Sequence, residues 1–301
     1  MSQIVAASPH VTTKNSTAVI MRDVLIALLP AVLAGCVVFG LRALLVIAVT
    51  TAACVFFEWG FEKLCHTPSM ISDLSAAVTG VLLAMNLPVS IPLWQAVFGA
   101  LVAIVAVKGL FGGIGKNFAN PAITARIVMF LAFSKTMTAW VFPDAVSSAT
   151  PLAMMANGES VDYLTLLLGN HGGCLGETSA LALLIGFAYL LIRGVISWHT
   201  PVCFVGTVFV MSLILGQDAV GQILSGGLML GAIFMATDYS TTPSTNLGRV
   251  LFGIGAGLLT VLIRFYGAYA EGVSFAILFM NILTPYLSKW TETKPFGGVA
   301  A

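Results

Sequence analysis

The scarcity of charged residues constrains this chain more than any other feature of its sequence. Only 8% of its 301 residues are Asp, Glu, Lys or Arg, whereas 58% are hydrophobic. Soluble domains typically carry about 25% charged residues. This chain therefore lacks the polar side chains that a water-exposed surface requires, and we expect lipid to be its solvent.

Apolar segments long enough to cross a bilayer recur along the chain. A spanning helix needs about 20 mostly apolar residues, and about ten segments come near this length. The sequence therefore predicts an all-α polytopic membrane protein. The predicted spans are 22–40, 42–62, 71–87, 92–110, 118–134, 178–195, 201–216, 218–236, 247–266 and 272–288.

The predicted spans form two groups of five with a polar stretch between them. Because five is odd, the two groups must have opposite orientations. The third span of each group contains a similar run of small residues, Ser75–Asn86 and Ser225–Met235, and each group ends near an Asn followed by a Pro, Asn120–Pro121 and Asn281 to Pro285. Interrupted segments at corresponding places are typical of inverted repeats with a site near the midplane.

We therefore predict two inverted five-helix repeats with interrupted helices. The predicted regions are an N-terminal segment 1–21, a first repeat 22–134, an outer loop 135–177, a second repeat 178–288 and a tail 289–301.

The distribution of Lys and Arg predicts the orientation. With the N-terminus in the cytoplasm, nine cations fall on the inner side and three on the outer side, which favours this orientation by the positive-inside rule. Both termini would then be cytoplasmic, and Thr150 would lie on the outer face. The inner group is Lys14, Arg22, Lys63, Lys108, Lys116, Arg193, Arg249, Lys289 and Lys294, and the outer group is Arg42, Lys135 and Arg264.

Cysteine spacing and net charge exclude some kinds of site. The five cysteines are scattered without a CxxC pair, so no local zinc or iron–sulfur site is encoded. His171 and Cys174 supply only two ligands in a glycine-rich run, for which we expect a flexible loop. A net charge of +1 without a basic cluster gives no indication of a nucleic-acid partner.

The polar stretch contains the run Asp144–Pro151, which has two interpretations. Thr150 before Pro151 is typical of a helix start, with threonine as the N-cap and proline at the first helical position. That interpretation does not explain Asp144 or the small residues before Thr150, which leave its hydroxyl open to a bulky partner. A helix N-terminus also suits a phosphate, so the run is a candidate attachment site as well.

A glycine-rich turn, Gly112 to Pro121, precedes the fifth span. It is not a Walker loop, which would need glycine at Leu110 and Ser or Thr at Asn117. It is either a tight turn before a proline-initiated helix or a ligand clamp whose amides bind a planar polar ring such as an isoalloxazine. The candidate binding residues are Gly113, Gly115, Lys116, Asn117 and Asn120.

Polar residues at membrane depth are costly and commonly functional. Asp238, in the run Thr237–Pro243, lies at the end of span eight and is either a solvated loop residue or part of an ion path. Asp73 and Asn86 are the other candidates for handling a cation or proton. Arg126 lies within span five and needs a partner or a cavity.

Together these motifs resemble the D subunits of Rnf complexes, the ion-translocating ferredoxin:NAD oxidoreductases. They are also similar to the related B subunits of sodium-translocating NADH:quinone oxidoreductases. The resemblance covers nearly the whole chain, and the short polar start favours the Rnf side. The segments that carry it are Ser8–His10, Gly113–Asn117, Asn120–Pro121, Phe234–Asp238 and Glu271–Asn281.

The resemblance implies two flavins. A flavin transferase would join FMN to Thr150 through a phosphoester, and a noncovalent, riboflavin-like flavin would lie within the membrane part, where we place it near the turn Gly113–Pro121. Ser148 departs from the Gly or Ala that the attachment motif usually has at this position. The motif maps onto Asp144, Ser147, Ser148, Ala149 and Thr150.

By this resemblance the chain is an electron relay and not a complete enzyme. It has no dinucleotide fold and no cluster ligands, so NAD and ferredoxin would react on partner subunits that carry flavin and iron–sulfur centres. Electron flow would be coupled to movement of sodium or protons. The alternatives are an inverted-repeat transporter or channel without a redox cofactor, and a cofactor-free membrane scaffold. Protein-bound flavin would favour the relay over both.

Overall fold

The computed structural model describes residues 16–67, 69–140, 150–169, 171–267 and 272–292. Within these ranges the regular structure is helical, with an isolated antiparallel bridge between Pro88 and Cys174. The prediction of an all-α polytopic membrane protein is confirmed. Four predicted site residues lie outside the described residues, namely Asp144, Ser147, Ser148 and Ala149.

The first half contains the first five predicted spans. Two long helices, α1 (Thr17–Phe39) and α2 (Leu41–Leu64), are followed by a 3-10 turn, η1 (Ile71–Asp73), and the short α3 (Ser75–Met85). The helix α4 (Leu93–Leu101) continues as a π-helix, η2 (Val102–Gly109). The half ends with α5 (Pro121–Ala132) and α6 (Ser134–Met137).

The second half repeats this order after two short connecting helices, α7 (Pro151–Ala156) and α8 (Tyr163–Leu168). It begins with α9 (Ala180–Ile192) and α10 (His199–Ile214). Its third span consists of α11 (Ala219–Leu224), α12 (Leu228–Leu230) and a π-helix, η3 (Gly231–Met235). The last two spans are α13 (Asn246–Tyr266) and α14 (Val273–Trp290).

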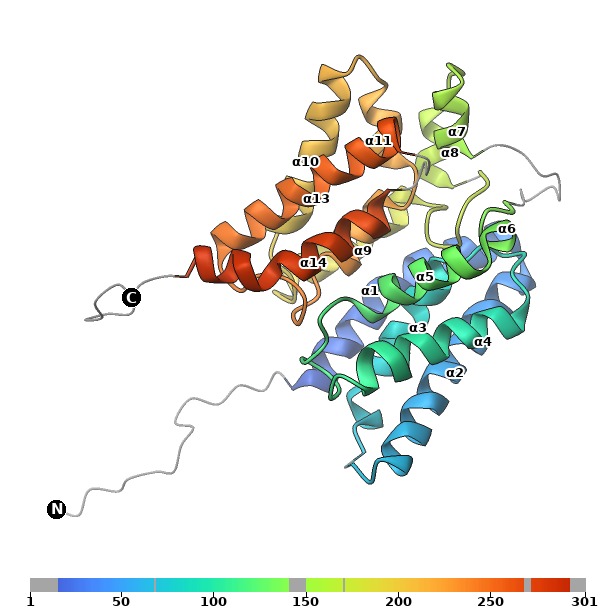
Figure 1. The fold of residues 1–301 in the computed structure, drawn as a ribbon. Helices are drawn as coiled ribbons and strands as arrows, with labels where there is room; N and C mark the ends of the chain where they lie inside the picture. Colours follow the sequence, from blue (N-terminus) through green and yellow to red (C-terminus); the bar gives the residue numbers. More distant parts are fainter. Residues whose placement is uncertain (1–15, 68, 141–149, 170, 268–271, 293–301) are drawn as a thin grey trace, which may run out of the picture.

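Equivalent helices of the two halves pack together. Figure 1 shows α1–α6 as one group and α9–α14 as another, with α7 and α8 at one end of the molecule. The first helices of the halves, α1 and α9, are in contact, and so are the last, α5 and α14. The interface between the halves is therefore built by elements that occupy the same place in each half.

Both third spans are interrupted, as predicted. In the first half the break is at Leu74, which has a left-handed φ of +63° between η1 and α3. In the second half it is at Gly226 and Gly227, with φ of +69° and +67°, a conformation that glycine adopts without steric cost. The carbonyls freed at this second break accept hydrogen bonds from Arg264, at 3.0 Å from Ser225 O and 3.2 Å from Gly226 O. Protein groups thus satisfy the broken backbone, as a membrane interior requires.

The interruptions and turns shorten most of the spans. By length and composition, three helices of the described chain can cross a bilayer alone, α1, α2 and α13. Further apolar segments are shorter, for example Ser75–Met85 and Pro121–Ala132. Such helices can be placed in a membrane only when packed against the longer ones, which ties their position to the tertiary fold.

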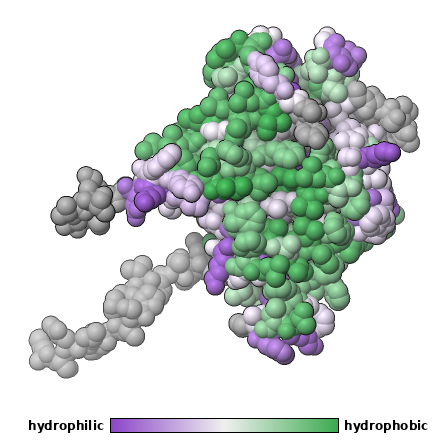
Figure 2. All heavy atoms as spheres, in the orientation of Figure 1, coloured by the Kyte–Doolittle hydropathy of each residue, from purple (hydrophilic) through white to green (hydrophobic). Residues whose placement is uncertain are grey.

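The outer surface of the bundle is apolar. Val37 is 84% exposed and Ile192 is 86% exposed, far beyond what a water-soluble surface would favour for such residues. Figure 2 shows hydrophobic residues over most of the visible face and hydrophilic residues toward its edges. This distribution matches a protein whose sides contact lipid.

The connecting segment differs from the predicted outer loop. Residues 171–179, which include His171 and Cys174, are buried and not a flexible surface loop. The segment pairs with the end of α3, where Gly176 N donates to Met85 O at 2.7 Å and Leu175 N to Leu87 O at 3.1 Å. The expectation of a flexible loop is therefore wrong, because these backbone groups find partners inside the protein.

Candidate functional site

The glycine-rich turn folds as a sequence of left-handed residues. Gly112, Gly113 and Gly115 have φ of +102°, +91° and +82°, which side-chain-bearing residues rarely adopt. The turn reverses the chain between η2 and α5 and brings Asn117 and Asn120 toward the second half. Its glycines serve this reversal, so the interpretation as a tight turn is confirmed by the backbone.

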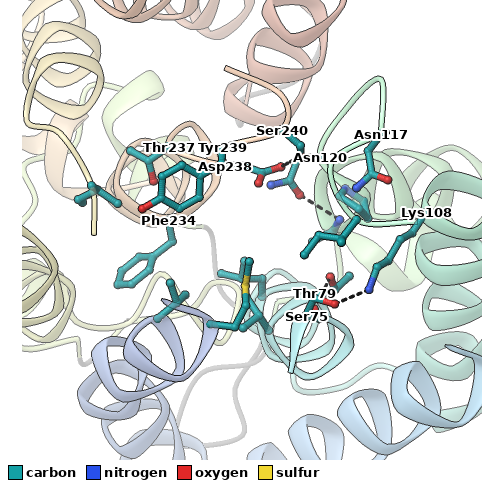
Figure 3. Close-up of a pocket in the computed structure, with 18 of the residues that line it drawn as sticks. Ser75, Thr79, Lys108, Asn117, Asn120, Phe234, Thr237, Asp238, Tyr239 and Ser240 are labelled. Atoms are coloured by element: carbon teal, nitrogen blue, oxygen red, sulfur yellow. Dashed lines mark hydrogen bonds between the residues drawn. The ribbon is translucent and has the colours of Figure 1, made fainter. Parts of the chain in front are cut away.

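A pocket lies between the two halves beside this turn (Figure 3). The first half contributes Asn117, Asn120 and Thr79, and the second half contributes Phe234 and Asp238. Polar groups come from the turn, from the loop after η3 and from Ser75, Thr79 and Lys108 of α3 and η2, and apolar side chains form the remaining wall. The further lining residues are Met21, Val24, Ser75, Val78, Leu82, Lys108, Ile114, Pro121, Ala122, Leu190, Val195, Ile196, Thr237, Tyr239 and Ser240.

Asn117 carries an unused acceptor in this pocket. Its Oδ1 atom is buried and has no hydrogen-bond partner among the residues described. A buried amide oxygen without a donor costs about 1–3 kcal/mol. A ligand with an N–H group would remove this cost, and an isoalloxazine ring carries such a group. The unpaired Asn117 acceptor beside apolar lining residues therefore fits a planar ring that carries an N–H group.

Asn120 is held by the fold. Its Oδ1 caps α5 by accepting from Ala122 N at 3.0 Å and Ile123 N at 3.3 Å. Its Nδ2 donates to Met235 O at 3.4 Å, and its backbone N donates to Asn281 Oδ1 at 3.2 Å. The two Asn–Pro sites noted in the sequence thus meet through a hydrogen bond. Asn120 shapes the pocket wall, and Asn117 offers the free acceptor.

The remaining turn residues lie away from the pocket. Gly115 and Lys116 are exposed and do not line it. The aliphatic part of Lys116 folds over Gly112, where a Cβ would come within 2.9 Å of Lys116 Cδ. Gly113 lines a neighbouring cavity on the other side of the turn.

The three ion-path candidates lie in different places. Asp238 lines the pocket and is half-buried; its carboxylate accepts from Ser240 Oγ at 2.9 Å and Thr241 Oγ1 at 3.1 Å. Burial raises the pKa of the Asp238 carboxyl, and these two hydroxyls oppose the shift. Asp73 accepts from Ser75 N at 2.7 Å and Ser75 Oγ at 2.5 Å, at the start of α3.

Asn86 belongs to a buried network around Arg126. Arg126 donates to Asn86 Oδ1 at 3.2 Å, to Ser274 Oγ at 2.9 Å and to Cys174 Sγ at 3.4 Å, and it lies 3.8 Å from Glu177 Oε1. The need of Arg126 for partners inside the membrane is therefore met. The sequence gives no sign of the role of Glu177, since this residue lies in a stretch with the composition of a loop.

A second buried ion pair is also absent from the sequence-based expectations. Lys108 is 4% exposed, lies in η2 and pairs with Glu58 of α2. The charge count assigns Lys108 to the inner side, although the predicted span 92–110 contains it. The structure buries Lys108 within the bundle, so it is not a loop cation. The signal that could reveal the pair is a Glu and a Lys within two otherwise apolar segments.

Thr150 begins α7 as its N-cap. Its Oγ1 accepts from Ala153 N at 3.3 Å, and its side chain is half-buried. The helix α7 packs against α11, where a Cβ on Gly221 would come within 2.5 Å of Met155 Sδ. The N-cap interpretation is confirmed. The structure packs α7, of which Thr150 is the N-cap, against α11 of the interrupted span eight.

Metal-binding groups do not gather in the part of the chain that the structure describes. No three side chains of His, Cys, Asp or Glu there lie close enough to hold a metal ion.

Comparison with known proteins gives a consistent result. The model of the NQR2, RnfD, RnfE family matches residues 4–297. The chain is 46% identical to the D subunit of the Na(+)-translocating ferredoxin:NAD(+) oxidoreductase complex of Acetobacterium woodii, over 97% of this chain and 95% of the relative. It is 38% identical to the D subunit of the proton-translocating ferredoxin:NAD(+) oxidoreductase complex of Clostridium ljungdahlii, over 97% of this chain and 96% of the relative.

A third relative is more distant. The D subunit of the ion-translocating oxidoreductase complex of Halorhodospira halophila is 34% identical, over 99% of this chain and 96% of the relative. These matches run nearly from end to end and include both halves and the turn between η2 and α5. The chain belongs to the NQR2, RnfD, RnfE family.

Proposed function

We propose that the chain is the membrane electron-relay subunit of an ion-translocating ferredoxin:NAD oxidoreductase complex. The names of its relatives support this assignment, as does their identity over nearly the whole chain. The chain is not catalytically complete alone. Partner subunits bearing flavin and iron–sulfur centres react with NAD and ferredoxin, and this chain carries electrons between them.

Thr150 is the proposed attachment site for FMN. The observation that carries this proposal is the run Asp144 to Thr150, which ends at the half-buried N-cap of α7, a helix that packs against α11 of span eight. A flavin transferase would form a phosphoester on the Thr150 hydroxyl, and that hydroxyl would then give up its cap bond to Ala153 N. Asp144, Ser147, Ser148 and Ala149 would present the threonine to the transferase.

The pocket between the halves is the proposed site of a second, noncovalent flavin. Asn117 would accept the ring N–H through its buried Oδ1, and Phe234 would cover an apolar part of the ring. Asp238 would hold a proton at the polar end. A bound flavin supplies one-electron redox chemistry here, and the protein positions the ring and excludes water from it.

Orientation and coupling complete the proposal. Both termini are assigned to the cytoplasmic side and the Thr150 loop to the outer face of a bacterial or archaeal cytoplasmic membrane. Electron flow is coupled to sodium or proton movement. The two more similar relatives carry different ions in their names, so membership of the family does not select one ion.

The test is the mass of the purified chain after co-expression with its flavin transferase. We expect a mass increment of one FMN on the peptide that contains Thr150, and its loss in Thr150→Val. Thr138→Val is the matched control, since Thr138 is an exposed threonine in the same polar stretch, and it should keep the flavin. Covalent flavin on Thr150→Val would contradict the assignment.

The main alternative is an inverted-repeat transporter or channel without a redox cofactor. The two interrupted third spans and a pocket between the halves favour it, because these features are typical of secondary transporters. An unmodified Thr150 peptide, together with no acid-extractable flavin and ion flux through the isolated chain, would establish this alternative.

A further inference from the structure

The buried pair of Lys108 and Glu58 has no role in the electron relay proposed for this chain. The two residues are 4% and 6% exposed and lie on different membrane helices, η2 and α2. A buried ion pair contributes little net stability, because desolvation offsets the attraction between the charges. Ionisable residues at membrane depth are by default candidates for function. The surroundings of the pair therefore indicate what it does.

Lys108 lies on the wall between two cavities. On one side is the pocket proposed for the noncovalent flavin, and on the other is a second cavity lined by Glu58, Glu62 and Gly113. Lys108 lines both. Its Nζ donates to Ser75 Oγ at 2.5 Å and to Glu58 Oε1, so it links a residue of the flavin pocket to a residue of the second cavity. Figure 3 shows Lys108 directed toward Ser75 and Thr79 at the edge of the pocket.

The π-helical turn explains how Lys108 reaches this place. The helix changes from α to π at Val102, so η2 carries one extra residue per turn up to Gly109. Single π turns occur frequently at functional sites. Here the last π turn ends directly after Lys108 and points its ammonium group inward.

The second cavity holds two carboxylate oxygens without partners. Neither Glu58 Oε2 nor Glu62 Oε2, both buried, has a hydrogen bond within the described ranges. Glu62 uses its other oxygen to accept from Met70 N at 2.8 Å. The charged groups that act on Glu58 are Lys108, Asp73 and Glu62, and Cys54 also faces the pair. Glu58, the ion-pair partner of Lys108, thus lies among further acidic groups.

We propose that Glu58 and Lys108 form a proton relay from the second cavity to the ligand of the flavin pocket. This inference rests on the proposed noncovalent flavin. When the complex delivers an electron to the pocket, an N–H bond of the Lys108 ammonium breaks and an N–H bond to a ring nitrogen forms. The Glu58 carboxylate then takes a proton from solvent through the second cavity and passes it to the Lys108 amine, which restores the ion pair. One proton thus enters for each electron.

The test uses the purified complex and three kinds of variant. Lys108→Met removes the proton donor and the charge. Lys108→Arg keeps the charge and the pairing with Glu58, but a guanidinium does not give up its proton at neutral pH. Glu58→Gln removes the acid that reloads Lys108. The control is Lys63→Met, because Lys63 is exposed at the end of α2, with its Nζ 4.8 Å from the centroid of the Trp59 ring.

Acid-extractable flavin per chain and the rate of reduction of that flavin after mixing with NADH would be measured in H₂O and D₂O. We expect wild-type flavin content in Lys108→Arg and Glu58→Gln, with reduction slowed on the order of a hundredfold, the usual contribution of a positioned acid, and a larger solvent isotope effect. Lys63→Met should match the wild type.

The outcomes separate the relay from the proposed function. Wild-type rate and isotope effect in Lys108→Arg and Lys108→Met, with flavin bound, would overturn the relay and leave the pocket assignment standing. A wild-type complex without acid-extractable flavin in this chain would overturn the pocket assignment and the relay together. Slowing in Lys108→Met but not in Lys108→Arg would show that Lys108 acts through its charge alone, which also overturns the relay.

Discussion

Asn117 and Asn120 have the same side chain but different tasks. Asn120 precedes Pro121 and caps α5, a role that sequence predicts because Asn is a favoured N-cap and Pro a favoured first residue of a helix. Its bond to Met235 O joins the two halves and is invisible in the local sequence. Asn117 makes no such bond through its buried Oδ1 to any described residue, which leaves that oxygen for a ligand. Only the tertiary structure could separate these two roles.

Asp238 should make stability depend on pH. The pKa of the Asp238 carboxyl is higher in the folded protein than its ordinary value of 3.8. At a pH above 3.8, the folded protein therefore holds a proton on Asp238 that the unfolded chain has lost. Stability is therefore lost as pH rises from that value through the raised pKa. The side chain of Asp238→Asn cannot ionise, so the stability of this variant should not fall over that pH range. At a pH above the raised pKa, the variant should be more stable than the wild type. Thermal unfolding of the detergent-purified protein from acidic to neutral pH measures the effect.

Asp162 provides a control of opposite sign. Hydrogen bonds from Thr165 and from Leu164 N lower the pKa of this exposed carboxyl. The contribution of Asp162 to folding stability is fully present at a pH above the ordinary Asp pKa. It is lost as the pH falls through the lowered pKa of the folded protein. Asp162→Asn should therefore not raise stability at neutral pH. Identical pH profiles for Asp238→Asn and the wild type would contradict the burial argument.

At the level of helices, close contact between α1 and α9 depends on Gly186. A Cβ placed there would lie 2.3 Å from Ala27 O and 2.9 Å from Phe234 Cζ. Gly186→Ala should cost roughly 1–3 kcal/mol from overpacking, against about 1 kcal/mol gained in helix propensity. Gly206→Ala in α10 is the matched control, because no atom lies within 4 Å of its added Cβ. Unfolding in mixed micelles should show a lower free energy of unfolding for Gly186→Ala and no decrease for Gly206→Ala. Equal effects of the two substitutions would show that α1 and α9 can move apart at no cost.

The sequence predicts the helices better than the segments between them. Each predicted span meets a helix, and both interruptions are visible as small residues followed by polar ones and a proline. The segment 171–179 has the composition of a flexible loop, but its partners, the backbone groups of Met85 and Leu87, are far away in the sequence. Lys108 lies inside the predicted span 92–110, but the local sequence reveals neither the π turn that carries it nor its pairing with Glu58.

At the scale of the whole molecule, Arg126 links both halves and the connecting segment through one buried network. It lies on α5 in the first half and donates to Ser274 on α14 in the second half. It also contacts Cys174 and Glu177 in the buried connecting segment. The network is nearly fully buried, so its hydrogen bonds are not screened by water, and each member depends on the others. The halves and the connection should therefore unfold as one unit while Arg126 is present.

Removal of Arg126 should weaken the whole molecule and uncouple its halves. Arg126→Met leaves Glu177 buried without its cation, a change that typically costs about 3–5 kcal/mol. Arg42→Met, which removes an exposed arginine bonded to Ile91 O at 2.8 Å, should cost less than about 1 kcal/mol. Variants that retain only Trp94 or only Trp198 would report on each half by fluorescence. We expect coincident transitions with Arg126 and separate ones in Arg126→Met. Coincident transitions at wild-type stability in Arg126→Met would show that the other contacts between the halves, such as Asn120 Nδ2 to Met235 O, couple them without Arg126.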